Sequence, residues 1–102
     1  MISRAERRVE LRPVARREVV DAFDRYEEQS AGLGLEFLRA VRATVAQLRE
    51  APEMYPKVHS ETRRALLRRF PYAVFYRETT DAVIVLGVVH THRDPQVWQS
   101  RT

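Results

Sequence analysis

The residues best suited to binding phosphate are arginines crowded into one short stretch of the sequence. They are Arg63, Arg64, Arg68 and Arg69, and the chain continues directly with Phe70, Pro71 and Tyr72. A guanidinium offers paired donors to a phosphate group and stays charged at neutral pH. Because side chains alternate along a strand, a strand here would place Arg64 and Arg68 on one face and Arg63 and Arg69 on the other. Arginines on both faces cannot all enter a core. One set should therefore meet solvent, a binding partner, or an acidic residue of the helices, namely Asp21, Glu28 or Glu36.

A second candidate site follows an apolar run near the C-terminus, where His90, His92 and Arg93 stand close together. Histidine can act as a general acid or base near neutral pH, and arginine can stabilise charge that develops on a phosphate. Together they would suit RNA cleavage, although histidines at the end of a strand need have no chemical function. No third ligand stands beside the two histidines, so no metal site is predicted. Tyr72 and Tyr76 could donate a proton, but tyrosines in a half-buried strand are also common without a function.

The residues after this histidine pair have local roles in the predicted fold. Asp94 is expected to cap a short C-terminal helix, with Pro95 as its first residue. Arg93 is expected to anchor the tail or to contact a target. Trp98 is expected to close the edge of the core rather than to stack on a base or a partner.

The elements that must position these side chains begin with a strand and two helices. Alternating polar and apolar residues predict a strand over residues 8–12, and helical spacing predicts helices over 13–30 and 35–50. Gly32 and Gly34 should form a tight turn between the helices. The expected buried positions are Ala15, Val19, Ala22 or Phe23, and Tyr26 in the first helix, and Leu33, Phe37, Val41, Thr44, Val45 and Leu48 in the second.

The second half of the chain is predicted to be mainly strands. Residues 51–60 contain two prolines and are predicted as a loop, and residues 62–69 as a strand, although their pattern also fits one or two helical turns. Residues 73–77 and 82–89 are predicted strands joined by a hairpin turn at 78–81, with 82–89 at the centre of the sheet. The sequence thus predicts a two-layer α+β domain of order β-α-α-β-β-β. A helical hairpin would pack on a mainly antiparallel sheet, with a short helix at the C-terminus.

Length, composition and charge limit the class of protein. With 102 residues, of which 44% are hydrophobic and 31% charged, the chain is expected to form one folded domain over residues 1–102. It has no cysteine, and its longest apolar run, residues 82–89, is far too short to span a bilayer. The N-terminus lacks the pattern of a signal peptide, so a cytoplasmic location without membrane association is expected.

The positive charge is unevenly distributed along the chain. The net charge of +4 is concentrated in residues 1–18, with six Arg and three acidic residues, and in 61–77, with five Arg and one acidic residue. This distribution fits either a basic face for an acidic partner or an ordinary solvated surface.

Two segments together resemble the RelE/ParE family of toxins from type II toxin-antitoxin systems. They are RALLRRFPYAVFY at residues 64–76 and VVHTHRDPQVW at residues 88–98. The resemblance extends to Phe37, Pro52 and Pro56 and covers roughly residues 7–99. The residues of the family motifs are Phe70, Pro71, Tyr72, Tyr76, His90, Arg93, Asp94, Pro95 and Trp98. The resemblance implies a RelE-like fold and a toxin that a cognate antitoxin holds inactive in a hetero-oligomer, with no cofactor.

The resemblance leaves two targets open, because the family divides. RelE-like members cut messenger RNA in the ribosome, whereas ParE-like members inhibit DNA gyrase, and the toxins are associated with growth arrest and plasmid stabilisation. This sequence has Ala73 where the nucleases tend to carry a catalytic arginine, and Trp98 near the place of their terminal tyrosine. The resemblance therefore favours gyrase inhibition. The target-binding candidates are then Arg64, Arg68, Arg69 and Arg93, and for the alternative, RNA cleavage, the candidates are Arg68, His90, His92 and Arg93.

Overall fold

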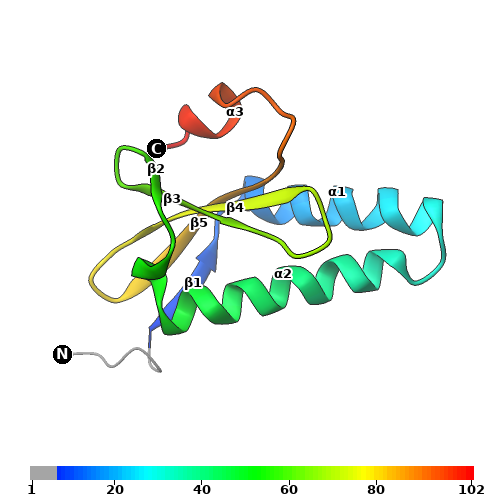
Figure 1. The fold of residues 1–102 in the computed structure, drawn as a ribbon, viewed down its shortest axis with the longest axis horizontal. Coiled ribbons are helices and arrows are strands. Elements are labelled where there is room, and N and C mark those ends of the chain that lie inside the picture. The colour runs from blue at the N-terminus through cyan, green and yellow to red at the C-terminus, as the bar shows by residue number, and fades with distance from the viewer. Residues whose placement is uncertain (1–6) are drawn as a thin grey trace.

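The computed structural model describes residues 7–102 and consists of a helical hairpin packed on a five-stranded sheet (Figure 1). In chain order the elements are β1 (Arg8–Leu11), α1 (Pro13–Gln29), α2 (Leu33–Glu50), the 3-10 helix η2 (Pro52–Met54), β2 (Lys57–His59), β3 (Thr62–Leu66), β4 (Tyr72–Glu78), β5 (Ala82–His90) and α3 (Gln96–Gln99). The strands lie in the order β1-β5-β4-β3-β2. β1 pairs with β5 in parallel, and every other pair is antiparallel. The predicted α+β class with a mainly antiparallel sheet is confirmed.

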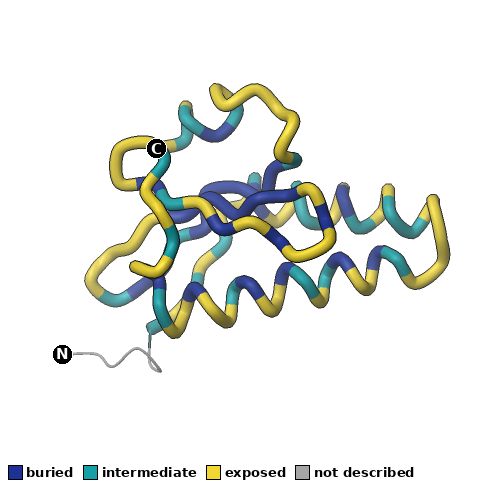
Figure 2. The backbone as a smooth tube through the Cα atoms, viewed as in Figure 1, coloured by how far each residue is buried: buried dark blue, intermediate teal, exposed yellow. Residues whose placement is uncertain are grey.

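The two long helices bury the stripes that their spacing predicts. Ala15 and Ala22 are buried on α1, with Val19 and Tyr26 half-buried beside them. On α2 the buried residues include Phe37, Val41, Thr44 and Leu48. Pro13 opens α1, where its fixed φ suits the first turn and its missing N–H is not needed. These stripes meet one face of the sheet and form the main core (Figure 2).

The connection between the helices depends on two glycines, Gly32 in the turn and Gly34 in the first turn of α2. Gly32 has a φ of 90°, a left-handed conformation that residues with a Cβ rarely adopt. Gly34 is buried, and a Cβ there would lie 2.6 Å from Cγ of Glu27 and 2.7 Å from the carbonyl oxygen of Phe23. Instead, the Glu27 carboxylate accepts hydrogen bonds from the backbone N–H groups of Gly32 and Gly34, at 3.2 and 2.8 Å. The glycines therefore let the two helices approach closely, and α2 begins at Leu33, two residues earlier than predicted.

The hairpin of β4 and β5 is the centre of the sheet, as predicted. The N–H of Thr79 donates to the carbonyl of Ala82 at 2.8 Å, which closes the turn at residues 78–81. β5 is buried along almost its whole length, because the helices cover one of its faces and α3 partly covers the other (Figure 1). None of the described helices is long and apolar enough to cross a membrane.

Two sequence predictions in this half of the chain are wrong. Residues 51–60 are not all loop, since they contain η2 and the edge strand β2, whose three residues are too few to show an alternating pattern. The predicted strand 62–69 ends at Leu66. It ends there because the chain turns: the N–H of Leu67 donates to the carbonyl of Tyr72 at 2.9 Å, and Arg69 has a left-handed φ of 69°. Arg68 and Arg69 therefore lie in a loop, and alternation along a strand does not describe their directions.

Candidate functional site

The two motif segments meet at one end of the sheet. Tyr72, the first residue of β4, pairs with His90, the last residue of β5. Just beyond this pair, the N–H of Thr91 donates to the carbonyl of Pro71 at 2.8 Å. The loop between β3 and β4, residues 67–71, and the loop between β5 and α3, residues 91–95, therefore lie side by side.

The first of these loops presents arginines on a fixed turn. The side chain of Phe70 is buried against Tyr26 and Phe37, with ring centroids 5.1 and 5.5 Å apart, and so anchors the turn in the core. Arg68 and Arg69 on the same turn are exposed. Arg69 forms the kind of ion pair anticipated from the sequence, with Glu36, but the charged atoms are 3.7 Å apart and both side chains are about half exposed or more. Such a pair contributes little to stability, so it leaves Arg69 available to a partner.

The arginines of β3 have separate surroundings. Arg63 donates to the carbonyl oxygens of Tyr55 and Glu53, at 2.5 and 3.3 Å, and lies 3.4 Å from the carboxylate of Glu78. It therefore holds the segment before β2 against the sheet rather than facing a target. Arg64 is exposed, and it pairs across the sheet with Phe75, which belongs to the core cluster under α3.

A second group of polar side chains surrounds Tyr72. The guanidinium of Arg25 on α1 donates to the Tyr72 hydroxyl at 2.8 Å, and this hydrogen bond raises the pKa of Arg25. The ring of His90 lies 5.2 Å from that of Tyr72, centroid to centroid. A small hollow of about 80 Å³ is lined by these three residues together with Glu18, Asp21, Val88, Val89 and Arg93. The sequence did not single out Arg25, which is 47 residues from Tyr72.

The two histidines lie together, but not as two positions on one strand. β5 ends at His90, and the following turn directs the backbone N–H of His92 to Nδ1 of His90 at 3.0 Å. The rings lie 5.1 Å apart. Because Nδ1 of His90 accepts this bond, the neutral imidazole carries its proton on Nε2 and can donate there. Within residues 7–102, no group of three or more His, Cys, Asp or Glu side chains is placed to hold a metal ion.

Trp98 lies in the core, as the sequence predicts, whereas α3 begins at Gln96, one residue later than predicted, with Pro95 rather than Asp94 at its N-cap position. Trp98 is 8% exposed and stacks on Phe75, with ring centroids 4.1 Å apart and an angle of 14° between the planes. The Asp94 carboxylate accepts a hydrogen bond from the N–H of Gln96 at 2.9 Å. Trp98 is therefore a core residue that holds α3 on the sheet, and Asp94 closes the turn before it.

Arg101, which the sequence analysis did not single out, anchors the tail. Its guanidinium forms two bonds to the carboxylate of Glu18, at 2.9 and 3.1 Å, and a third to the carbonyl of Leu86, at 3.2 Å. Arg93 is instead exposed beside His90. Glu18 and Arg101 are 83 residues apart, so no local pattern could indicate their pairing.

Tyr76 is not available as a proton donor to a target. Its side chain is fully buried, and its hydroxyl donates to the carbonyl of Pro52 at 2.5 Å. Burial raises the pKa of this tyrosine well above its ordinary value of 10.0. Its place in the family motif is therefore explained by packing.

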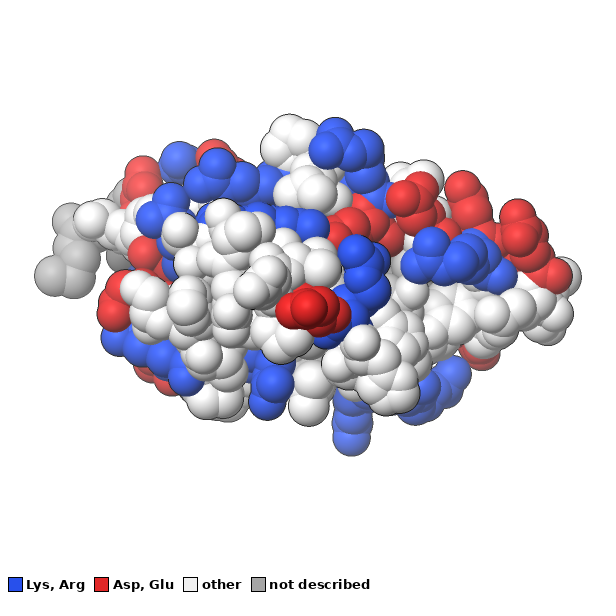
Figure 3. Space-filling model, turned by 90° about the horizontal axis from the view of Figure 1, so that it is seen from above, with Lys and Arg blue, Asp and Glu red and all other residues white. Residues whose placement is uncertain are grey.

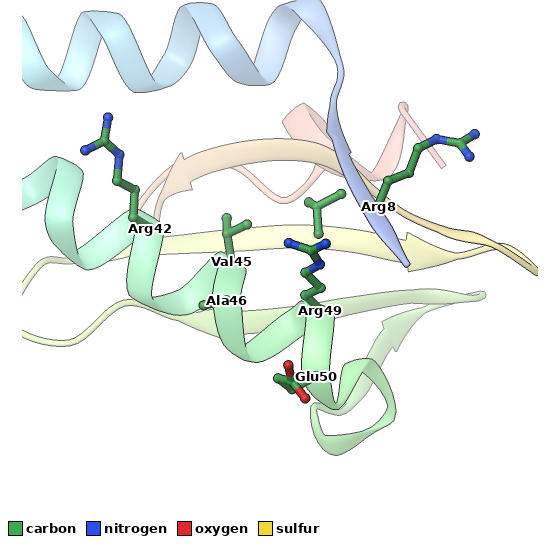
Figure 4. A pocket seen from close by; sticks show the side chains of 7 residues that line it. Arg8, Arg42, Val45, Ala46, Arg49 and Glu50 are labelled. Carbon is green, nitrogen blue, oxygen red and sulfur yellow. The ribbon is translucent and has the colours of Figure 1, made fainter. Parts of the chain in front are cut away.

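Charge and shape vary over the rest of the surface. Acidic side chains gather toward the far end of the helical hairpin, where α1 carries Asp21, Asp24, Glu27 and Glu28 (Figure 3). A hollow of about 710 Å³ lies between β1 and the second half of α2 (Figure 4). Its lining includes Arg8, Val45 and Arg49 but no residue of either motif segment.

Comparison with known proteins agrees with this architecture. A family model described as "ParE toxin of type II toxin-antitoxin system, parDE" matches residues 9–95. A solved structure described as the chromosomal ParDE TA system from P. aeruginosa has a chain of similar fold, with a TM-score of 0.63 and 16% sequence identity, covering 83% of this chain and 96% of that one. No curated protein matches the chain in sequence. Because the family match spans most of its length, the chain belongs to the ParE toxins of type II toxin-antitoxin systems.

Proposed function

We propose that this toxin inhibits DNA gyrase by binding, without cleaving nucleic acid, and that a cognate antitoxin neutralises it. The observation that carries the proposal is the packing of Ala73 and Trp98. These are the two positions where the resemblance to RelE-like nucleases would place an arginine and a tyrosine. Both are buried in one apolar cluster with Phe75 and Val89. The indole of Trp98 does not titrate in the range needed for acid or base catalysis.

The surface that would contact gyrase, or the DNA bound to it, is formed by the adjacent motif loops. Arg68 and Arg69 on one loop and Arg93 on the other are exposed, and Arg64 is exposed on the neighbouring strand. The bond between Thr91 and Pro71 and the buried ring of Phe70 fix these loops before any partner arrives. A preorganised surface loses less conformational entropy on binding, which favours affinity.

The antitoxin would use other parts of the molecule. β1 and β2 are the outer strands of the sheet, and an outer strand can accept an added strand from a partner. We expect the antitoxin to bind at such an edge and over the helical hairpin, giving a toxin-antitoxin hetero-oligomer. Gyrase inhibition would place the toxin in the cytoplasm and would arrest growth.

The test is a supercoiling assay with purified toxin and gyrase. It scores both the loss of supercoiling and the accumulation of cleaved plasmid, and antitoxin is added back in a parallel reaction. Wild-type toxin should inhibit, and R68E/R93E should lose inhibition because both changes reverse charge on the proposed surface. R16E/R17E is the matched control, since both arginines are exposed on α1 and the change in net charge is the same. If gyrase is unaffected at a large molar excess of a toxin that still arrests growth, the gyrase proposal fails.

A second candidate function is ribosome-dependent cleavage of messenger RNA, which one specific observation favours. Arg25, Tyr72, His90 and Arg93 line one small hollow, and these side chains could transfer a proton and stabilise a phosphate charge. Cleavage in a translating extract, mapped by primer extension, should then disappear in His90→Ala and His92→Ala. If gyrase inhibition is the function, both variants should inhibit supercoiling as well as the wild type.

A further inference from the structure

A groove rich in arginine lies between α2 and the loop that follows β3. Its volume is about 290 Å³, and its lining consists of Glu36, Arg39, Ala40, Arg68, Arg69 and Phe70. Three arginines from two separate segments thus line one hollow whose only acidic lining residue is Glu36. Arg39 is 29 positions before Arg68 in the sequence, so only the fold brings it to the motif loop.

The positive charge of the groove is poorly compensated within the protein. Glu36 approaches Arg69 only to 3.7 Å, and the two side chains are 49% and 70% exposed. Within residues 7–102, neither Arg39 nor Arg68 forms an ion pair. Two of the three arginines therefore keep their charge free for a ligand, and the third is held by a weak, solvated pair.

The loop side of the groove is held in a conformation that the chain would not adopt freely. Arg69 has a φ of 69°, a left-handed conformation that costs a residue with a Cβ about 1–2 kcal/mol. The surrounding bonds impose it, because the N–H of Leu67 donates to the carbonyl of Tyr72 and the N–H of Tyr72 to the carbonyl of Phe70. The arginines are thus presented on a rigid support, as in sites that bind a ligand without rearrangement.

We propose that this groove binds the phosphodiester backbone of duplex DNA. The choice of duplex DNA rests on the proposed gyrase function, in which the toxin would bind a DNA segment that is itself bound to gyrase. A phosphate backbone fits because arginine forks bind phosphate through paired donors, and neutralising several phosphates releases counterions. An acidic peptide fits less well. The only apolar side chains in the lining are Ala40, which is half-buried, and Phe70, which is 9% exposed, so an apolar anchor has little to bind.

The inference is tested without gyrase, by fluorescence anisotropy of a labelled 20-base-pair duplex titrated with full-length toxin between 50 and 200 mM salt. If each of the three arginines neutralises one phosphate, the slope of log K against log salt is about −2.7, and affinity falls about 40-fold over this range. Arg39→Ala should reduce the slope by about 0.9. R39E/R68E should abolish measurable binding, and Glu36→Gln should strengthen it because it removes the carboxylate that competes for Arg69.

R16E/R17E is again the control, and circular dichroism checks that every variant is folded. The inference is overturned if R39E/R68E weakens binding no more than the control does. It is also overturned if a 20-nucleotide single-stranded RNA binds more tightly with the same dependence on Arg39, or if polyglutamate displaces the duplex at equal charge. The two proposals fail separately. Arginine-dependent DNA binding supports the groove whatever the supercoiling assay shows, and a wild-type toxin that leaves gyrase active refutes only the proposed function.

Discussion

Replacing Trp98 with alanine tests whether α3 is held by packing, as the structure indicates. Trp98 is 8% exposed and stacks on Phe75 at 4.1 Å. A buried aromatic side chain covers about 150–250 Å², which at about 25 cal/mol per Å² corresponds to about 4–6 kcal/mol for complete burial. Because Trp98 belongs to a helix of only four residues, the surroundings can partly collapse. We therefore expect Trp98→Ala to lower the free energy of unfolding by about 3 kcal/mol, the lower end for such substitutions.

The measurement is urea unfolding followed by far-ultraviolet circular dichroism, since Trp98 is the only tryptophan and its fluorescence is lost in the variant. A loss of about 3 kcal/mol corresponds to a fall in Tm of about 12–24 °C for a domain of this size. Trp98→Phe is the matched variant: it keeps a ring on Phe75 and should cost about 1–2 kcal/mol while retaining growth arrest. If Trp98→Ala costs less than about 1 kcal/mol yet abolishes growth arrest, Trp98 contacts the target and the packing argument is wrong.

Three further changes test the internal contacts. Arg101→Ala should lower the free energy of unfolding by about 1–2 kcal/mol, because it leaves the half-buried carboxylate of Glu18 without its partner. Hydrogen exchange at the Val88 amide, which donates to Glu18, should accelerate. An unchanged exchange rate there would refute this role. Tyr76→Phe should cost about 1–3 kcal/mol near neutral pH, since it leaves the buried carbonyl of Pro52 unpaired, and chemical denaturation measures it. The pKa of Tyr76 is raised on folding, so its contribution is present below pH 10 and is lost as pH rises toward the folded pKa. The wild type should therefore lose stability with a limiting slope of about 1.4 kcal/mol per pH unit that Tyr76→Phe lacks. Gly34→Ala should cost about 1–3 kcal/mol by forcing α1 and α2 apart, and an unchanged Tm would contradict the close approach described above.

The helices and the central hairpin could be predicted from the sequence because their signals are long and locally consistent. α1 and α2 span 17 and 18 residues, and each buries residues at intervals of three and four. β2 was missed because three residues at an edge, two of them exposed, carry no periodic pattern. The end of β3 was misplaced because the left-handed φ of Arg69 is imposed by bonds to Tyr72 and by the burial of Phe70, not by the type of residue at that position.

The site was only partly predictable, for a related reason. The sequence located the two motif segments and the exposed arginines, and it placed Trp98 in the core. It did not indicate Arg25 or Arg101, because each bonds to a residue far away in the chain, nor Arg39, because only the fold brings it to the motif loop. Such side chains look like ordinary solvated helix or tail positions until the packing of α1 and α2 on the sheet is known.

The position of the motif loops depends on an irregularity in β5. Between Phe75 and Tyr76 the register with β5 shifts: Phe75 pairs with Gly87 and Tyr76 with Val85, which leaves Leu86 as the extra residue of a bulge. β1 accompanies β5 only as far as Val85, so the edge beyond it needs other partners. Arg101 donates to the carbonyl of Leu86, and Glu18 accepts from the N–H of Val88 at 3.0 Å. The ion pair between Arg101 and Glu18 thus supplies hydrogen bonds to the edge of β5 that a neighbouring strand would otherwise supply. This pair therefore holds the part of β5 that leads into the loop at residues 91–95, although neither of its members lies within a motif segment.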